Sequence, residues 1–315
     1  MTGDIVIGTR DSTLAMWQAE WVTGALRRAN PDLNFHVRGM KTKGDNILDV
    51  ALAKIGDKGL FTKELEVALL NGEINLAVHS MKDLPTRLPE GLAIGAVCER
   101  EYPGDVLISK NGETLAELKT GARIGTSSLR RRAQLLYYRP DLRIVDLRGN
   151  LTTRLRKLRE TDLDAVVLAY SGIKRLGYED LITQLIPFDI CLPAVGQGSI
   201  GVEIRIDDAI TRSIIAPIDH EQSRIAVEAE RSFMKRLEGG CQVPIGALGR
   251  VENDLLFLEG VVADLHGKNA VRHLVSGPVQ NAGQLGIKLA DTLLEMGADK
   301  ILTQARREFG FYDDK

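Results

Sequence analysis

The chain has 315 residues, of which 44% are hydrophobic and 27% are charged, and its formal net charge is −2. This composition is typical of a globular protein with a large core, and the length favours about two domains, with three possible. The near-neutral charge gives a nucleic-acid partner no support, and no apolar run approaches the ~20 residues of a membrane-spanning helix.

The first hundred residues alternate strand and helix patterns. Short apolar runs predict strands at 5–7, 35–40, 76–78 and 92–97. Ser12 and Thr62 are candidate N-cap residues, and an apolar helical pattern follows each of them. The second of these helices is expected to bury a broad face that includes Leu65, Val67 and Leu69.

A second alternating set begins after a turn-rich break at 102–104. Its expected strands are 106–108, 123–125, 144–147 and 165–169, and its expected helices are 128–138 and 151–159. This alternation predicts a largely parallel sheet covered by helices. The glycine-rich residues 193–201 are either a hinge or a return strand, and the pattern over 225–296 predicts a smaller α+β domain.

The segment 123–159 is strongly basic, with ten arginines and one lysine against two aspartates. Some of these arginines belong to a solvated helix face, because the consecutive Arg130, Arg131 and Arg132 point about 100° apart on a helix. Arg156 and Arg159 are expected to face solvent, whereas Arg154 lies beside the apolar stripe of its helix.

Two short segments combine glycine, hydroxyl residues and arginine directly after a predicted strand. They are Gly8–Ser12 and Gly125–Ser128, the second of which leads into the consecutive arginines. Small hydroxyl residues at a helix start leave backbone N–H groups free for an anion, and arginine binds carboxylate or phosphate with two donors. Both segments are expected at the carboxyl edge of a sheet. They predict a site for a small polyanion, either phosphate or carboxylate.

Lys82 and Asp83 follow the predicted strand 76–78 and allow two interpretations. Asp83 either caps a turn before Pro85, with Lys82 solvated, or is a lone carboxylate in an arginine-lined cleft. In the second case it stabilises a developing cation or moves protons. Cys241 follows two glycines, and is either a small buried hydrophobe or a thiolate that forms a covalent bond.

The cysteines and histidines favour a reducing compartment and no metal. Cys98, Cys191 and Cys241 are far apart, which indicates reduced thiols rather than a disulfide framework or a zinc cluster, and Cys98 and Cys191 are expected to be buried. The five histidines lack metal-ligand spacing, and no nucleotide-binding motif is present. Because residues 1–10 lack a signal-peptide pattern, we expect a cytoplasmic protein.

Seven segments together resemble the porphobilinogen deaminase family, over essentially the whole chain. They are Gly8–Ser12, Leu52–Leu65, Ala77–Asp83, Gly125–Arg131, Leu147–Asn150, Leu192–Gly198 and Leu237–Gly246. The resemblance implies an α/β fold of two periplasmic-binding-protein-like lobes with a small α+β C-terminal domain. The implied domains are 1–98 with 199–216, then 104–192, and then 221–315, which carries Cys241. A monomer is also implied.

The resemblance implies a transferase of tetrapyrrole (haem) biosynthesis. Such an enzyme deaminates porphobilinogen and joins four units head to tail into hydroxymethylbilane, releasing ammonia. A dipyrromethane attached to Cys241 by a thioether is the implied cofactor and primer. Asp83 matches the carboxylate that binds pyrrole N–H groups and stabilises the cationic azafulvene.

The other matching positions hold the acetate and propionate groups of the pyrroles or lie near the reacting ring. Those matched to the cofactor are Ser80, Lys82, Thr126, Ser128, Arg130, Arg131 and Arg148. Those matched to the substrate are Arg10, Ser12, Lys54, Lys58, Phe61, Arg154, Arg175 and the hinge residue Gln197. Arginines suit this task because each pyrrole carries two carboxylates and arginine keeps its charge when partly buried. A covalent primer makes each condensation effectively intramolecular.

Thr13 and Asp11 depart from the family pattern, since proline is expected at 13 and Asp11 adds a negative charge near Arg10. Neither position carries an implied role. Two other functions remain open: a two-lobed solute receptor or ligand sensor, and a nucleic-acid-binding protein. The first lacks a signal peptide or an obvious helix-turn-helix, and the second has only Tyr137 and Tyr138 as stacking residues in its basic segment.

Overall fold

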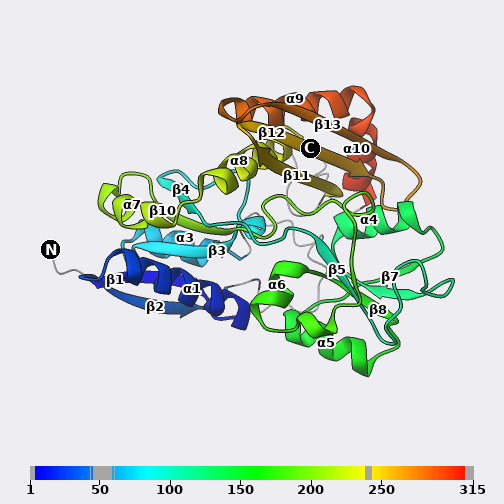
Figure 1. Cartoon of the computed structure of the whole chain (residues 1–315), viewed down its shortest axis with the longest axis horizontal. Coiled ribbons are helices and arrows are strands. Elements are labelled where there is room, and N and C mark those ends of the chain that lie inside the picture. Colours follow the sequence, from blue (N-terminus) through cyan, green and yellow to red (C-terminus); the bar gives the residue numbers. More distant parts are fainter. Residues whose placement is uncertain (1–3, 43, 45–58, 60, 238–242, 309–315) are drawn as a thin grey trace. The chain divides into compact units, whose positions relative to one another are not determined.

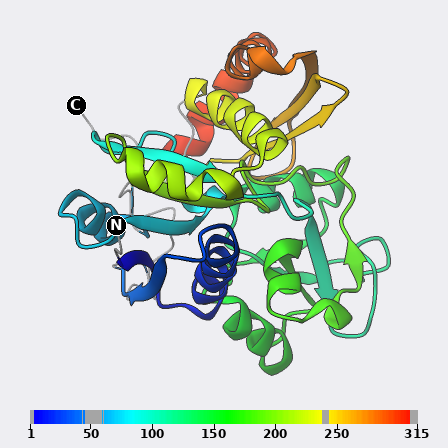
Figure 2. The same ribbon diagram turned by 60° about the vertical axis from the view of Figure 1, so that its left-hand side comes forward.

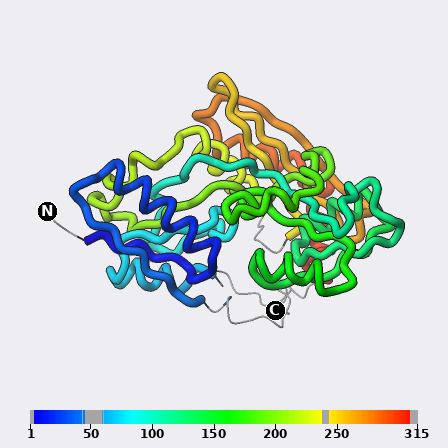
Figure 3. The backbone as a smooth tube through the Cα atoms, turned by 60° about the horizontal axis from the view of Figure 1, so that its bottom comes forward, coloured from blue at the N-terminus to red at the C-terminus, as the bar shows by residue number. Residues whose placement is uncertain are grey.

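The computed structural model describes residues 4–42, 44, 59, 61–237 and 243–308 (Figure 1). They fall into two compact units, the first with one sheet and the second with two. The first unit holds the described residues up to Glu101 together with Gly198–Arg224, and the second holds Tyr102–Gln197 and the described residues from Ile225 onward. Figure 3 shows the course of the chain by colour.

The first unit is built on a five-stranded sheet in the order β2-β1-β3-β10-β4. Its strands are β1 (Asp4–Arg10), β2 (Asn34–Met40), β3 (Leu76–Ser80), β4 (Leu92–Val97) and β10 (Ile200–Arg205). The long helix α1 (Thr13–Ala29) packs against β1, β2 and β3 (Figure 2). Its other helical elements are α3 (Lys63–Leu70), η2 (Met81–Asp83), α7 (Ala209–Ile215) and η4 (Ala216–Ile218).

Alternation along the strands explains why helices cover both faces of this sheet. Ile5 and Ile7 of β1 pack in one cluster with residues of α1 and α7. Val6, between them, packs instead with the cluster of Leu65 and Leu69 on α3. Successive side chains of a strand point to opposite faces of the sheet. Because consecutive residues of β1 are apolar, both faces must be covered by helices.

The second unit contains another five-stranded sheet, in the order β7-β6-β8-β5-β9. Its strands are β5 (Asp105–Ser109), β6 (Arg123–Gly125), β7 (Arg143–Val145), β8 (Ala165–Ala169) and β9 (Gln184–Leu185). Its helices are α4 (Leu129–Tyr138), α5 (Leu151–Glu160), α6 (Tyr170–Arg175) and η3 (Glu179–Leu181). Leu135 of α4 packs on one face of the sheet, and Leu155 of α5 packs on the other.

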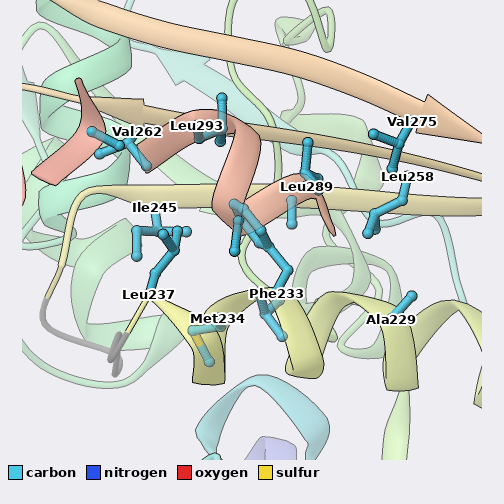
Figure 4. Close-up of a cluster of buried hydrophobic side chains, with 14 of the residues drawn as sticks. Ala229, Phe233, Met234, Leu237, Ile245, Leu258, Val262, Val275, Leu289 and Leu293 are labelled. Atoms are coloured by element: carbon cyan, nitrogen blue, oxygen red, sulfur yellow. The ribbon is translucent and has the colours of Figure 1, made fainter. Parts of the chain in front are cut away.

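The C-terminal part of the second unit is an antiparallel sheet with helices on it. It consists of α8 (Glu221–Arg236), β11 (Ile245–Glu252), β12 (Leu255–Ala263), β13 (Ala270–Pro278), η5 (Val279–Asn281), α9 (Ala282–Glu295) and α10 (Ala298–Glu308). Phe233 of α8 and Leu289 of α9 are fully buried in its core (Figure 4). None of the helices described is long and apolar enough to cross a membrane.

The structure corrects the sequence predictions in four places. Each five-stranded sheet has two parallel and two antiparallel pairings, so the prediction of largely parallel sheets is wrong. The strand β11 and the helix α10 were not predicted. Val67 is exposed rather than part of the buried face of α3. Of the two interpretations of 193–201, the return strand is correct for its last two residues, where β10 begins.

The crossing at Gly198 requires a glycine. Its φ is +98°, and a Cβ there would lie 2.3 Å from the carbonyl oxygen of Glu101, which is backbone and has little room to move. We expect Gly198→Ala to lower the free energy of unfolding by more than the ~1–3 kcal/mol that a positive φ alone costs a non-glycine residue. Gly72→Ala is the matched control, since its φ is +71° and no atom lies within 4 Å of the added Cβ. Equal losses in denaturant unfolding would contradict the steric argument.

Candidate active site

A cavity in the first unit opens at the carboxyl ends of β1 and β3. It is lined by Arg10, Ser12, Leu14, Ala15, Gln18, Phe61, Thr62, Val78, His79, Ser80 and Asp83. The structure thus brings together five residues that the sequence singled out: Arg10, Ser12, Phe61, Ser80 and Asp83. They lie at the edge where an α/β sheet binds ligands, because both parallel strands end there.

Neighbouring side chains fix the polar groups of this cavity. The guanidinium carbon of Arg10 lies 4.3 Å from the centre of the Phe61 ring, a cation–π contact. The amide nitrogen of Gln18 lies 2.9 Å from the hydroxyl of Ser80. Asp83 ends the turn η2, and its neighbours Met81 and Leu84 are both buried. The carboxylate therefore projects from a turn whose apolar residues anchor it in the core.

The second unit contains a buried ion cluster around Asp105, the first residue of β5. One carboxylate oxygen accepts a hydrogen bond from Arg130 Nη1 at 2.8 Å, and the other accepts one from Arg131 Nη2 at 2.7 Å. All three side chains are buried. Burial raises the pKa of Asp105, but the charges and hydrogen bonds of the two arginines lower it by more, so its pKa lies well below the usual range.

Two further side chains contact the same carboxylate. Gln197 donates from its amide nitrogen to Asp105 at 2.9 Å and to the carbonyl oxygen of Pro103 at 2.6 Å. The Cys191 sulfur lies 3.6 Å from Asp105. Burial raises the pKa of Cys191 to about 12, so this thiol stays protonated and unreactive at neutral pH. Cys98 and Cys191 are both buried, as predicted, and neither forms a disulfide.

The arginine pair retains donors that no described residue accepts. The Nε atoms of Arg130 and Arg131, and one Nη atom of Arg148, are buried without a hydrogen-bond partner among the described residues. Among the described residues, two guanidiniums paired with one carboxylate also leave one buried positive charge uncompensated. Such a charge is costly unless it meets an anion. The donor set therefore fits a carboxylate-bearing group, and the acetate and propionate side chains of a dipyrromethane are such groups.

The start of α4 at Ser128 differs in part from the predicted anion site with free backbone N–H groups. The backbone N–H of Arg131 donates to the Ser128 hydroxyl at 3.4 Å, and that of Ser128 donates to Thr126 Oγ1 at 3.2 Å. These two N–H groups are not free for an anion, because the small hydroxyl residues cap them. Arg132 points elsewhere and donates to the carbonyl of Leu265, which confirms that the three consecutive arginines do not share one site.

The other predicted positions lie on four separate segments. Arg148 precedes α5, Arg154 is on α5 and donates to the carbonyl of Gly149, and Arg175 ends α6. Lys82 lies on η2. Cys241, Lys54 and Lys58 lie outside the described residues.

Sequence reasoning missed three polar residues beside these sites: Gln18, Asp105 and Glu203. Asp105 follows a turn-rich segment, where acidic residues are common, so nothing in the sequence indicated that it is buried. Its role as the counter-charge of two arginines is visible only from its hydrogen bonds. Glu203 of β10 is buried and contacts His79 of the cavity. The sequence did contain a clue to Glu203, because it is an acidic residue within an otherwise apolar strand. A buried carboxylate needs a hydrogen-bond partner, which the sequence alone does not identify.

Fold and sites together define a class. They fit an α/β protein that binds a small molecule with several carboxylates through its arginines. The cavity also presents one carboxylate of the protein, Asp83, near the guanidinium of Arg10. Two family models match the chain, "Porphobilinogen deaminase, dipyromethane cofactor binding domain" over residues 5–213 and "Porphobilinogen deaminase, C-terminal domain" over residues 224–295. The chain belongs to the porphobilinogen deaminase family.

Curated relatives agree over nearly the full length. The porphobilinogen deaminase of Pelotomaculum thermopropionicum is 63% identical over 308 residues, covering 98% of this chain and 99% of the relative. That of Carboxydothermus hydrogenoformans is 60% identical, with the same coverage. Among solved structures, the periplasmic VFT2 domain of Bordetella pertussis BvgS matches with a TM-score of 0.42 and 14% identity, covering 68% of this chain and 86% of that one.

Family membership confirms three predictions. The chain is an enzyme, a transferase of tetrapyrrole biosynthesis that polymerises porphobilinogen. Its cofactor is dipyrromethane. Its fold class is confirmed as well: α/β lobes with a small C-terminal α+β domain.

Replacing Asp105 tests the ion cluster. In Asp105→Asn two buried guanidiniums lose their counter-charge, and we expect the free energy of unfolding at pH 7 to fall by about 3–5 kcal/mol. The pKa of Asp105 is lower in the folded than in the unfolded state, so its stabilisation is complete above about pH 4 and is lost as the pH falls further. The difference between wild type and variant should therefore shrink in acid.

The matched control for this substitution is Asp141→Asn. Asp141 pairs with Arg139 at 2.7 Å, but that pair is far more exposed than the Asp105 cluster. We expect a much smaller loss of stability in denaturant unfolding. Equal losses in the two variants would mean that burial of the Asp105 cluster does not strengthen it.

Proposed function

We propose that Asp83 is the catalytic carboxylate, and the observation that carries this is the cavity it shares with Arg10, Ser12, Phe61 and Ser80. The substrate porphobilinogen has a pyrrole N–H, an aminomethyl group and two carboxylates. The carboxylate of Asp83 accepts a hydrogen bond from the pyrrole N–H. When ammonia leaves, the electron pair of the breaking C–N bond departs with it, and a cationic azafulvene remains. Asp83 lowers the free energy of that cation because opposite charges are close in a partly enclosed site.

Arg10 and its neighbours orient the substrate. The guanidinium of Arg10 contacts the Phe61 ring, and we assign it to an acetate or propionate group of the substrate. Ser12 and Ser80 provide hydroxyl donors at the same edge. We include Lys54, Lys58, Arg154, Arg175 and Gln197 in the proposed substrate set.

A second set of residues holds the primer. Arg130, Arg131 and Arg148 supply the buried donors described above, and the proposed set also contains Ser80, Lys82, Thr126 and Ser128. Cys241 is the proposed attachment point. When bound, dipyrromethane supplies a pyrrole ring whose free α-carbon accepts the first substrate unit. The arginine donors orient this group by its carboxylates, away from the reacting carbon.

We also propose a monomeric cytoplasmic enzyme without a nucleic-acid partner, with the three domains expected above. The buried cysteines Cys98 and Cys191, neither of which forms a disulfide, support a reducing compartment. Arg130, Arg131 and Arg139 of the basic segment pair with aspartates, which argues against a phosphate-binding surface there. The separate apolar cluster around Phe233 and Leu289 supports a distinct C-terminal domain.

Asp83→Asn tests the catalytic assignment. We expect ammonia release to slow by about 10²–10⁴-fold, since the amide can hydrogen-bond a pyrrole but carries no charge for the cation. The melting temperature should change little, because Met81 and Leu84 anchor the turn. Asp11→Asn, which removes the extra charge beside Arg10, is the control and should keep near-normal turnover. Near-normal turnover of Asp83→Asn would remove the proposed role.

Intact mass tests the attachment site. The purified full chain should exceed its sequence mass by two linked pyrrole units, and Cys241→Ala should show no excess. Cys98→Ala, which changes a buried thiol of the first unit, should retain the excess mass. An excess that survives in Cys241→Ala would place the primer elsewhere.

A further inference from the structure

A buried imidazole–carboxylate pair lies at the cavity that contains Asp83. His79 Nε2 of β3 lies 3.0 Å from Glu203 Oε2 of β10, and the two side chains are 3% and 0% exposed. The antiparallel register pairs Glu203 with Ala77 and Gly201 with His79, so both side chains lie on the same face of the sheet. His79 also lines the cavity. The pair therefore connects the strand interior to the site of reaction.

This pair is expensive to bury. A carboxylate removed from water costs several kcal/mol unless its oxygens are bonded. Glu203 Oε1 is buried without a partner among the described residues. Apolar side chains would stabilise a sheet face at lower cost, so the pair calls for a functional explanation.

The hydrogen bond to Glu203 sets the tautomer of His79. A carboxylate accepts, so Nε2 carries the proton and Nδ1 carries a lone pair. Glu203 provides the one side-chain hydrogen bond that His79 makes among the described residues. His79 lines the cavity and its Nε2 is occupied by Glu203, so Nδ1 is the nitrogen left to act as a base.

The proposed reaction contains a step that such a base can serve. The new C–C bond joins the azafulvene methylene to the α-carbon of the accepting pyrrole. That carbon must then lose its proton to restore the aromatic ring. A base separate from Asp83 leaves that carboxylate ionised for the next substrate unit while the proton is removed.

We propose that His79, oriented by Glu203, accepts the proton from the α-carbon of the accepting pyrrole; this rests on the proposed role of Asp83. The C–H bond breaks, its electrons return to the ring, and the proton moves to Nδ1. Glu203 stabilises the imidazolium. The proton then passes to the released ammonia, which leaves as ammonium. The ammonium that leaves thus carries the three hydrogens of the substrate ammonium group and the one hydrogen lost from the accepting pyrrole.

Three other charged or titratable groups face this pair or its cavity. Arg10 comes from β1 and Asp83 from η2. Glu66 of α3 is buried nearby, and its Oε1 accepts a hydrogen bond from Thr62 at 2.6 Å. Burial raises the pKa of Glu66. Of the Glu66 and Glu203 carboxyl groups, that of Glu203 is the one in hydrogen-bond contact with His79.

His79→Gln in the primer-loaded full chain is the first test. We expect turnover to fall by about 10²–10⁴-fold, the usual contribution of a positioned base. Porphobilinogen deuterated at its free α-carbon should then react more slowly than the protonated substrate in the variant, because proton loss has become limiting. His36→Gln is the control, since His36 is an exposed histidine that pairs with Asp4. Turnover close to wild type, or a slow variant without an isotope effect, would overturn the proposal.

Glu203→Gln tests the pair without removing the imidazole. Loss of the carboxylate removes the group that would stabilise an imidazolium, so the acid limb of the pH–rate profile should move to lower pH and turnover should fall. An unmoved acid limb would overturn the role of Glu203. A third readout needs no turnover: the ¹⁵N NMR signals of His79 should report a proton on Nε2 in wild type. A proton on Nδ1 would contradict the proposal.

These outcomes are separable from failure of the assignment of Asp83. If Asp83→Asn keeps normal turnover, the proposed function of that carboxylate fails whatever His79 does. If Asp83→Asn is slow while His79→Gln is normal, the carboxylate assignment stands and the base is not His79. Primer mass measured in each variant shows whether a slow enzyme is merely unloaded.

Discussion

The buried contact between Asp105 and two guanidiniums is the constraint on which the second unit depends. One carboxylate at the start of β5 fixes Arg130 and Arg131 of α4, and through Gln197 it also holds the segment at which the chain leaves the unit. Desolvation of three charged groups is offset only because each carboxylate oxygen receives its own short hydrogen bond. Among the described residues, the same arrangement leaves one positive charge and two Nε donors without a partner. In the proposed function, the two arginines that stabilise this unit also hold the carboxylates of the primer.

The proposed function makes two opposite electrostatic demands. A growing pyrrole chain accumulates carboxylates, which favour cationic side chains. Each condensation, however, passes through a cation, and added arginines would destabilise it. In the proposed function Asp83 meets this second demand, from a turn anchored by Met81 and Leu84. The contact of Arg10 with Phe61 places one cationic side chain in the same cavity as this carboxylate.

Local patterns predicted the ends of strands and the residues that follow them. Gly8–Ser12 and His79–Asp83 meet at one edge, because a strand that runs into a polar turn leaves those side chains there. Partners set by distant register were beyond such reasoning. Glu203 reaches His79 because β10 returns antiparallel beside β3, although 124 residues separate the two. The strand β11 was missed because its hairpin turn, Asn253–Asp254, lacks the glycine that usually marks two residues of positive φ.

The period of β3 explains how one short strand serves several roles. His79 and Ser80 are adjacent, so they point to opposite faces of the sheet. Ser80 meets Gln18 of α1, and His79 meets Glu203 on the other side. The chain then turns through η2 and presents Asp83 beyond the sheet edge. A register shift of one residue would exchange the two faces and place the imidazole against α1, away from its carboxylate. The antiparallel pairing with β10 opposes such a shift over five residue pairs. The return strand thus has a chemical as well as a structural consequence: it supplies Glu203 and fixes the face on which His79 lies.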